Sequence, residues 1–213
     1  MIIIKHRQNL IEELIAAPNT YGVEVDLRNH GDKIVVFHDP FNNDAVTLDE
    51  WLREYKHSFL IANVKEEGLE PQLIPILEKH NVKEYFILDE SLPYIRKFAL
   101  NGLSKFAVRV SEIESAETAL NLVSHLRQQD KKIDWVWLDS FTGNPLPQET
   151  INVLKAAGLK LCQVSPELHH VDRPDVWEGM VERFLSQWGN APGNYVDMVC
   201  TKLPDTWHNY TNL

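Results

Sequence analysis

The chain has 213 residues, of which 44% are hydrophobic and 24% charged, a globular composition that excludes a disordered protein. Its 31 acidic and 21 basic residues give a net charge of -10, which argues against a broad nucleic-acid interface and against docking on anionic membranes. A small phosphorylated ligand stays compatible, because a bound metal or a local cation cluster can invert the local field.

The remaining composition indicates a protein of the cytoplasm. Cys162 and Cys200 are too few for a disulfide framework, and we interpret them as buried free thiols. The apolar start, Met1–Ile4, is too short for a secretion signal, and no run reaches the roughly 20 apolar residues of a membrane span. No linker rich in Gly, Ser or Pro divides the chain. We therefore expect one domain over residues 1–213, with an oligomeric state that the sequence leaves open.

Short runs rich in β-branched and aromatic residues alternate with helix-patterned stretches along the whole chain. The runs predict strands at Ile2–His6, Val23–Leu27, Ile34–His38, Phe59–Lys65, Tyr85–Leu88, Phe106–Val110, Trp135–Asp139, Leu159–Val164 and Val196–Thr201. The stretches between them predict helices at Asn9–Ala17, Leu48–Tyr55, Glu70–His80, Leu92–Leu100, Ser115–Gln129, Gln148–Ala157 and Trp177–Trp188. Asn9 is the expected cap of the first helix, and Thr47 and Glu50 read as a capping box for the second.

One connection in this series is too short for a parallel crossover, which takes about a dozen residues or more. Only Arg28–Lys33 joins the second and third runs, and Asn29–Asp32 has the composition of a hairpin turn. The third run is therefore an added antiparallel strand, and eight parallel strands remain. Eight strand–helix units predict a (β/α)₈ TIM barrel. The alternative is an open doubly wound sheet, which usually has a glycine-rich loop after its first strand, and residues 6–9 contain no glycine.

Chemistry in such a barrel lies at the C-terminal ends of the strands. Glu24 and Asp26 are two apart on one strand and so point to the same face. If that face is the interior, two adjacent carboxylates require a cation, and a hard divalent metal such as Mg²⁺ or Ca²⁺ suits oxygen ligands. The alternative is that both are exposed. Asn63 and Lys65 have the same spacing on the next parallel strand. The amide oxygen of Asn63 could bind a metal, and Lys65 could bind a phosphate. The alternative for Lys65 is that it reaches solvent.

His6 and His38 each end an apolar strand, where one imidazole can take a proton from a nucleophile and the other can give one to a leaving oxygen. A single histidine in such a place is commonly structural. Two of them flanking a Glu-x-Asp pair favour acid–base chemistry.

Further polar residues at strand ends are candidates for substrate contacts: Arg109, Asp139, Glu167 and Lys202. Arg109 is interpreted either as an anion clamp or as the partner of an interior acid such as Glu24 or Asp139. Trp135 and Trp137 point the same way, and core packing is favoured over an aromatic wall for a substrate headgroup. His169 and His170 are adjacent, which favours a solvated loop over a metal site.

Several of these segments together resemble a known family. His6-Arg7, then Gly22-Val-Glu24-Val-Asp26, then an apolar strand ending His38-Asp39-Pro40 are similar to the opening of the glycerophosphodiester phosphodiesterases. Their superfamily includes phosphatidylinositol-specific phospholipase C and sphingomyelinase D. Residues 196–204, ending Thr201-Lys-Leu-Pro, are similar to the family's last strand, which commonly ends Thr-Asp-x-Pro. The resemblance spans the chain and is strongest over residues 5–40.

The resemblance implies a (β/α)₈ barrel, a divalent metal and cleavage of a phosphodiester. By position it implies that His6 and His38 are the acid–base pair, that Glu24 and Asp26 are metal ligands, and that Arg7 and Lys65 hold the phosphate. The implied partner is a small phosphodiester or another phosphorylated ligand.

The sequence departs from the family pattern at three positions. Asn63 stands where the family's Glu-x-Lys motif has a third acidic metal ligand, which should weaken the metal or shift it to another acid such as Asp89 or Asp139. Gln8 replaces the glycine of His-Arg-Gly, and Lys202 stands where an acid is common. These departures are typical of a short, divergent branch.

Three hypotheses follow. The first is a metal-dependent phosphodiester hydrolase. The second is a catalytically degenerate barrel that binds a phosphorylated ligand without turnover, motivated by Asn63. The third is a sugar-phosphate lyase or isomerase that uses Lys65 as a Schiff base.

Overall fold

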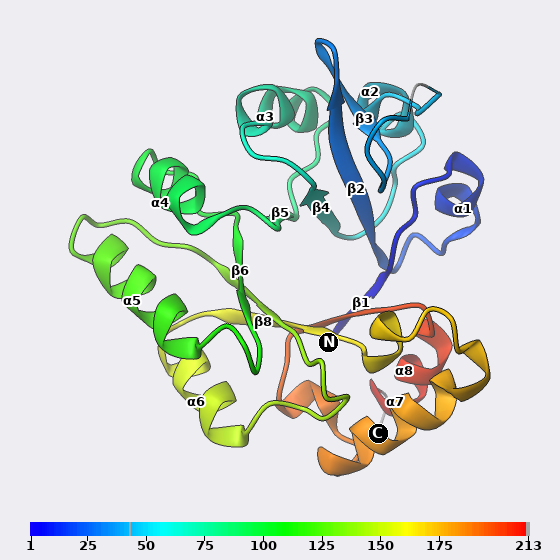
Figure 1. Ribbon diagram of the computed structural model, residues 1–213, viewed down its shortest axis with the longest axis vertical. Helices are drawn as coiled ribbons and strands as arrows, with labels where there is room; N and C mark the ends of the chain where they lie inside the picture. Colours follow the sequence, from blue (N-terminus) through cyan, green and yellow to red (C-terminus); the bar gives the residue numbers. More distant parts are fainter. Residues whose placement is uncertain (43, 212–213) are drawn as a thin grey trace.

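The computed structural model describes residues 1–42 and 44–211, and strands and helices alternate along them (Figure 1). The strands are β1 Ile2–Lys5, β2 Gly22–His30, β3 Lys33–Val36, β4 Leu60–Val64, β5 Tyr85–Leu88, β6 Ala107–Val110, β7 Trp135–Leu138, β8 Lys160–Val164 and β9 Met198–Thr201. The helices are α1 Ile11–Ala16, α2 Leu48–Trp51, α3 Glu70–Lys79, α4 Leu92–Leu100, α5 Ala116–Arg127, α6 Gln148–Ala156, α7 Trp177–Gln187 and α8 Pro204–Thr211, with short 3₁₀ turns η1 Pro166–His169, η2 Pro174–Val176 and η3 Pro192–Asn194.

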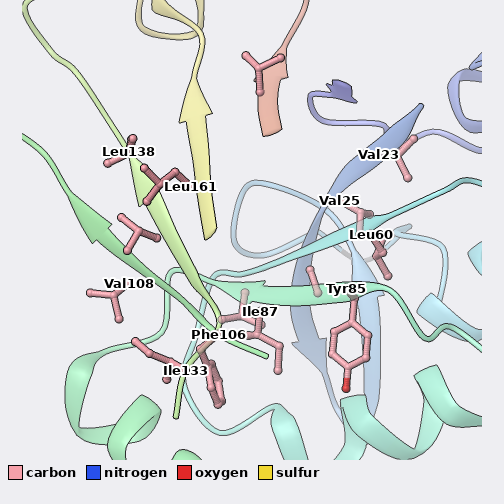
Figure 2. Packing of buried hydrophobic residues seen from close by; sticks show 14 of the residues in the cluster. Val23, Val25, Leu60, Tyr85, Ile87, Phe106, Val108, Ile133, Leu138 and Leu161 are labelled. Carbon is pink, nitrogen blue, oxygen red and sulfur yellow. The ribbon is translucent and has the colours of Figure 1, made fainter. Parts of the chain in front are cut away.

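Eight of the strands pair in parallel in the order β5-β4-β2-β1-β9-β8-β7-β6. A parallel bridge between Ile87 and Phe106 joins the two ends of this series, supported by a 2.9 Å hydrogen bond from Ile87 N to the Lys105 carbonyl. Figure 2 shows Ile87 and Phe106 where β5 meets β6. The sheet is thus a nearly closed barrel with helices between its strands, and the predicted TIM barrel is confirmed.

The added strand is also confirmed. β3 pairs antiparallel with β2 alone, in a register from His30 opposite Lys33 to Leu27 opposite Val36. The two-residue connection uses Gly31 at a φ of +63°, a left-handed conformation that glycine adopts without a steric penalty. The tip of the hairpin projects beyond the barrel between α2 and α3, at the top of Figure 1.

Strand alternation divides the apolar residues into two layers. Val23, Val25 and Leu27 belong to the large core between the barrel and its helices, part of which is drawn in Figure 2. A second cluster fills the barrel interior and includes Ile4, Ile61, Phe86, Trp135, Trp137, Cys162 and Cys200. Glu24 and Asp26, which alternate with the outward valines, therefore face the interior.

The interior cluster shows the role of the two tryptophans and the two cysteines. Trp135 and Trp137 are 6% and 5% exposed, and both rings pack against Phe86, so they are core residues. Cys162 and Cys200 are buried free thiols, as expected, and burial raises the pKa of both well above the ordinary value.

The helix signals were partly correct. Thr47 caps α2 and forms the predicted capping box with Glu50. The predicted cap at Asn9 is wrong, because Leu10 precedes α1 and the Asn9 side chain bonds to Asp26 instead. Helix α8 and the 3₁₀ turns were not predicted. All are short and begin at a proline, and α8 also follows the last strand of the regular pattern. Within the described ranges, no helix is both long and apolar enough to cross a membrane.

Gly22 marks the closest packing at the base of the interior, which leads to a test of the fold. A Cβ added there would overlap the side chain of Ile4 and lie 2.9 Å from the Phe59 carbonyl oxygen. We expect Gly22→Ala to lower the free energy of unfolding by about 1–3 kcal/mol through overpacking, measured by urea denaturation. Gly179→Ala is the matched control, because nothing lies within 4 Å of its added Cβ and alanine suits a helix. A Gly22→Ala protein as stable as the parent would contradict this packing.

Candidate active site at the C-terminal rim of the barrel

The C-terminal ends of the strands form the rim of the barrel, and charged side chains there alternate in sign. Successive ion pairs connect residues that lie on or follow β1, β2, β4, β5, β6, β7 and β8. We call this chain of ion pairs the rim network: Arg7, Asp26, Lys65, Asp89, Arg109, Asp139 and His169.

The two carboxylates on β2 lie at the centre of the site. Glu24 and Asp26 are each only 1% exposed, so water does not solvate their charge. Burial and, to a smaller extent, the neighbouring Asp26 raise the pKa of Glu24 to about 8, although Lys65 and a hydrogen bond from Asn63 oppose the rise. The Glu24 carboxyl group is therefore destabilised as an anion unless a cation compensates it.

Asp26 is held in its ionised form by its partners. Lys65 Nζ lies 2.9 Å from Asp26 Oδ1, and Arg7 Nε lies 3.4 Å from Oδ2. Asn9 donates to Oδ2 at 2.8 Å and accepts from the Asp26 backbone N–H at 3.0 Å. Burial acts to raise the pKa of Asp26, but Lys65, Asn9 and Arg7 outweigh it and the pKa is lowered. Asn9 was missed as a site residue because its sequence context is that of a helix cap.

Asn63 sits directly opposite Asp26 on β4 and bears on whether a metal fits here. Its Nδ2 donates to Glu24 Oε1 at 2.8 Å, whereas its Oδ1 is buried without a hydrogen-bond partner. Within residues 1–42 and 44–211, no three His, Cys, Asp or Glu side chains gather closely enough to hold a metal ion. Glu24 and Asp26 alone supply two carboxylates, and the Asn63 amide oxygen is a neighbouring third donor. The donors of Glu24, Asp26 and Asn63 Oδ1 are all hard oxygens, which fit Mg²⁺ or Ca²⁺.

His6 directly follows β1 and lies beside Glu24 in the site. Its Nε2 lies 3.8 Å from Glu24 Oε2, and its Nδ1 is buried without a hydrogen-bond partner. Burial and the positive charge of Arg7 lower the pKa of His6 to about 3, and Asp26 only partly opposes this. The ring is therefore a neutral imidazole at physiological pH.

His38 lies at the rim beside β2 but is not brought into contact with His6. The Phe37 backbone N–H donates to the Asp26 carbonyl at 3.1 Å. This hydrogen bond places the next residue, His38, beside β2 near Asp26. Its side chain is 39% exposed, and its Nδ1 lies 2.8 Å from Asp39 Oδ1. Its carbonyl accepts from Arg28 Nε at 2.9 Å, which fixes the loop.

Arg109 forms ion pairs with interior acids, which was one of its two interpretations. Its guanidinium contacts Asp89 and Asp139 and lies 3.7 Å from Glu114. His169 Nε2 lies 2.5 Å from Asp139 Oδ1. The expectation of a solvated loop was therefore wrong for His169. Pro166 begins a tight 3₁₀ turn after β8, and that turn returns the imidazole to the rim.

Glu167 lies below the rim and is fully buried. Thr201 Oγ1 donates to its Oε1 at 2.6 Å, and the Lys202 backbone N–H donates to the same oxygen at 2.8 Å. Ser165 Oγ donates to its Oε2. The carboxylate joins the ends of β8 and β9, which fixes the backbone that carries Lys202, and it presents no exposed surface to a ligand.

A cavity of about 500 Å³ opens beside His6 at the ends of β1 and β9. Its lining includes three of the predicted site residues, His6, Arg7 and Lys202. Trp177, the first residue of α7, forms one wall, and its indole N–H donates to the His170 carbonyl at 2.7 Å. Trp177 was missed because its position at a helix start carries no strand-end signal.

Two rim residues have strained backbones. Arg7 and Asp89 have φ values of +51° and +66°, in the left-handed region that non-glycine residues rarely occupy. The Arg7 backbone N–H donates to Glu24 Oε2 at 2.6 Å, so the strained turn places a donor on the buried carboxylate. Such strain is maintained by surrounding contacts and is concentrated at functional sites.

A second buried carboxyl pair lies next to the rim network and gives a pH test. Glu90, which follows Asp89, is 8% exposed, and Glu70 at the start of α3 is fully buried. Burial is the largest cause, and together with the charges of Glu70 and Glu67 it raises the pKa of Glu90 to about 8.

Because the folded protein holds this proton more tightly than the unfolded chain does, Glu90 lowers stability as pH rises from about 5 to 8. Glu90→Gln removes the titration, so we expect its free energy of unfolding relative to the parent to increase by roughly 1–3 kcal/mol over that range. Urea denaturation at several pH values measures this. A difference between the two proteins that stays constant with pH would contradict the assignment.

Comparison with known proteins supports the fold. No family model matches the chain, and no curated protein matches it by sequence. Among solved structures, a protein from Agrobacterium tumefaciens str. C58 (Dupont), assigned as a glycerophosphoryl diester phosphodiesterase, superposes with a TM-score of 0.67 at 16% identity, covering 99% of this chain and 97% of that one. A glycerophosphoryl diester phosphodiesterase from Parabacteroides distasonis ATCC 8503 gives 0.66 at 14% identity, covering 99% and 86%.

A third structure, the glycerophosphodiester phosphodiesterase from Agrobacterium tumefaciens str. C58, gives a TM-score of 0.66 at 12% identity and covers 100% of this chain and 99% of that one. These superpositions extend over nearly the whole chain, whereas the identities are low. They therefore establish a shared architecture. The chain has the (β/α)₈ barrel fold of the glycerophosphodiester phosphodiesterase structures.

Proposed function

We propose that the protein is a metal-dependent phosphodiester hydrolase that acts on a small phosphodiester in the cytoplasm. The observation that carries this proposal is the juxtaposition of an imidazole and a buried carboxylate, His6 and Glu24, at a rim that also presents Arg7 and Lys65. Phosphodiester cleavage needs a base, charge neutralisation and a protonated leaving oxygen. The likeness in fold to glycerophosphodiester phosphodiesterases supports the same reaction class.

In this proposal the cations Arg7 and Lys65 bind the phosphate. Both side chains already contact Asp26, which orients them toward the same point of the rim. Their charges are fixed before the substrate arrives, so little reorganisation is needed when negative charge develops on the phosphate oxygens. A guanidinium also offers two parallel N–H donors to a phosphate.

The histidines divide the proton transfers. His6 Nε2 faces Glu24 and would accept the proton of the attacking hydroxyl or water. His38 contacts Asp39 through Nδ1, which leaves its Nε2 to give a proton to the leaving oxygen.

A divalent metal completes the proposed site, with Glu24, Asp26 and the orphaned Oδ1 of Asn63 as its protein ligands. When bound, the metal would neutralise charge on the phosphate and acidify the nucleophilic hydroxyl. For the chain itself, a cation here would relieve the desolvated Glu24 carboxylate, which Asn63, the Arg7 backbone N–H and the charge of Lys65 compensate in part.

A second candidate function is the binding of a phosphorylated ligand without turnover. It is favoured by the amide at position 63, which leaves the site short of a third acid. The lyase or isomerase hypothesis has less support. Lys65 Nζ is engaged by Asp26 at 2.9 Å and lies 3.7 Å from Asp89, which favours an electrostatic role over a neutral amine nucleophile.

Substitution of the two histidines tests the hydrolase. We expect His6→Asn and His38→Asn each to lower kcat on bis(4-nitrophenyl) phosphate by about 10²–10⁴-fold, because each removes a positioned proton carrier. Release of nitrophenolate measures the rate, and circular dichroism checks the fold. His30→Ala at the exposed hairpin tip is the control. Full activity in both variants would refute the acid–base roles, and a parent protein that binds phosphate without any turnover would favour the degenerate barrel.

Substitution of Asn63 tests the metal site by direct binding. We expect Asn63→Leu to weaken Mg²⁺ or Ca²⁺ binding at least roughly tenfold, because the orphaned carbonyl is lost, and Asn63→Asp to tighten it by adding a charged ligand. Without metal, Asn63→Asp should lower the Tm, since a third buried carboxylate is unpaired. Calorimetry measures the affinity, with Asn152→Asp on the exposed face of α6 as control. Equal affinities in all variants would remove Asn63 from the site.

A further inference from the structure

The cavity beside His6 has a charge opposite to that of the whole molecule. The chain carries a net charge of -10, yet the lining of this cavity includes the cations Lys5, Arg7 and Lys202 and one carboxylate, that of Glu13. Glu13 accepts from the Leu10 backbone N–H at 3.5 Å and so closes the first turn of its own helix. Positive charge is therefore concentrated at one pocket of the rim, although the protein as a whole is acidic.

Of these three cations, Lys5 and Lys202 form no ion pair with a carboxylate within the described residues, and Lys202 is the one that follows β9 at the rim. Arg7 is paired with Asp26 at 3.4 Å, whereas no carboxylate in residues 1–42 and 44–211 lies within 4 Å of Lys202 Nζ. Its backbone is fixed by the hydrogen bond to Glu167, and its side chain lines the cavity together with His6. The charge of Lys202 is thus available to a ligand in the cavity.

The aromatic wall is already occupied by this lysine. Lys202 Nζ lies over the Trp177 ring, 5.1 Å from its centroid, and the Trp177 indole is held by the His170 carbonyl. An indole face is otherwise a good site for a quaternary ammonium or other cationic headgroup. Here the internal ammonium takes that position and repels a second cation. Both the positive charge of the pocket and its filled aromatic face would disfavour a cationic headgroup.

We propose that the substrate is a phosphodiester whose non-reacting alcohol carries a second anionic group, a carboxylate or a phosphate, bound by Lys202 in the cavity between α1 and Trp177. This inference rests on the proposed function for the identity of the reacting group. The space suffices, because about 500 Å³ accommodates a small ligand beside the phosphate site. Lys202 is then the residue that determines which alcohol is accepted.

Four 4-nitrophenyl phosphodiesters test the proposal, with propyl, 2-carboxyethyl, 2-phosphonoethyl and 2-(trimethylammonio)ethyl as the second alcohol. The expected kcat/KM of the parent is at least roughly tenfold higher for an anionic arm than for the cationic arm, with propyl between them. The carboxylate and phosphonate arms distinguish the two anions. Lys202→Glu should reverse the ratio of anionic to cationic arms, and Lys202→Met should bring it close to one.

Lys160 provides a matched control. Its ammonium also lies over a tryptophan ring, 5.3 Å from the centroid of Trp135, but at the start of β8, the opposite end of the strand from the rim. Lys160→Glu makes the same charge change and should leave the ratio of the four substrates unchanged. A parent that turns over all four diesters equally, or a Lys202→Glu variant with the parental ratio, would overturn the assignment of Lys202.

Binding separates this inference from the proposed function. Calorimetry with the non-hydrolysable propyl, 2-carboxyethyl and 2-(trimethylammonio)ethyl phosphonates should give the same ranking, with the anionic compound bound at least roughly tenfold more tightly than the cationic one. This ranking in a protein that turns over none of the diesters supports the anionic pocket and refutes the hydrolase. Equal or reversed affinities overturn the anionic pocket, whatever the protein's turnover.

Discussion

Two carboxylates buried side by side on one strand set the chemistry of the whole rim. Strand alternation leaves Glu24 and Asp26 on the inner face, where water cannot stabilise their charges. Arg7, Lys65 and Asn9 compensate Asp26, and Asn63 and the strained turn at Arg7 contact Glu24. Lys65 in turn reaches Asp89, from which Arg109 and Asp139 extend the alternation of charge. The rim network is the consequence of satisfying these two acids.

The fold was largely readable from the sequence because strands and crossovers leave strong local patterns. All eight barrel strands and the added hairpin strand were predicted, since β-branched runs and the short Arg28–Lys33 connection depend on neighbouring residues alone. The orientation of Glu24 and Asp26 was left open, because alternation states that two residues share a face without stating which face is inside. The outward packing of Val23 and Val25 decides it.

The site was less readable, because loop side chains reach partners that are remote in sequence. Asn9 has the sequence of a helix cap, but Asp26, 17 residues later, offers it both an acceptor and a donor. His169 reads as a loop residue, but the turn begun at Pro166 carries it to Asp139, 30 residues away. Trp177 is at a helix start and meets Lys202 only in the folded chain. Such contacts depend on the tertiary arrangement, which a local pattern does not encode.

The junction between β5 and β6 differs from the other joints of the barrel. Elsewhere the strands are joined by continuous backbone ladders, whereas here one bridge at Ile87 is supplemented by the ion pair of Arg109 with Asp89. The barrel is thus closed between β5 and β6 partly by an electrostatic interaction. Ladders of amide hydrogen bonds are insensitive to ionic strength, but the attraction between partly exposed charges is screened by salt. Added salt is therefore expected to weaken this joint of the barrel more than the joints formed by backbone ladders.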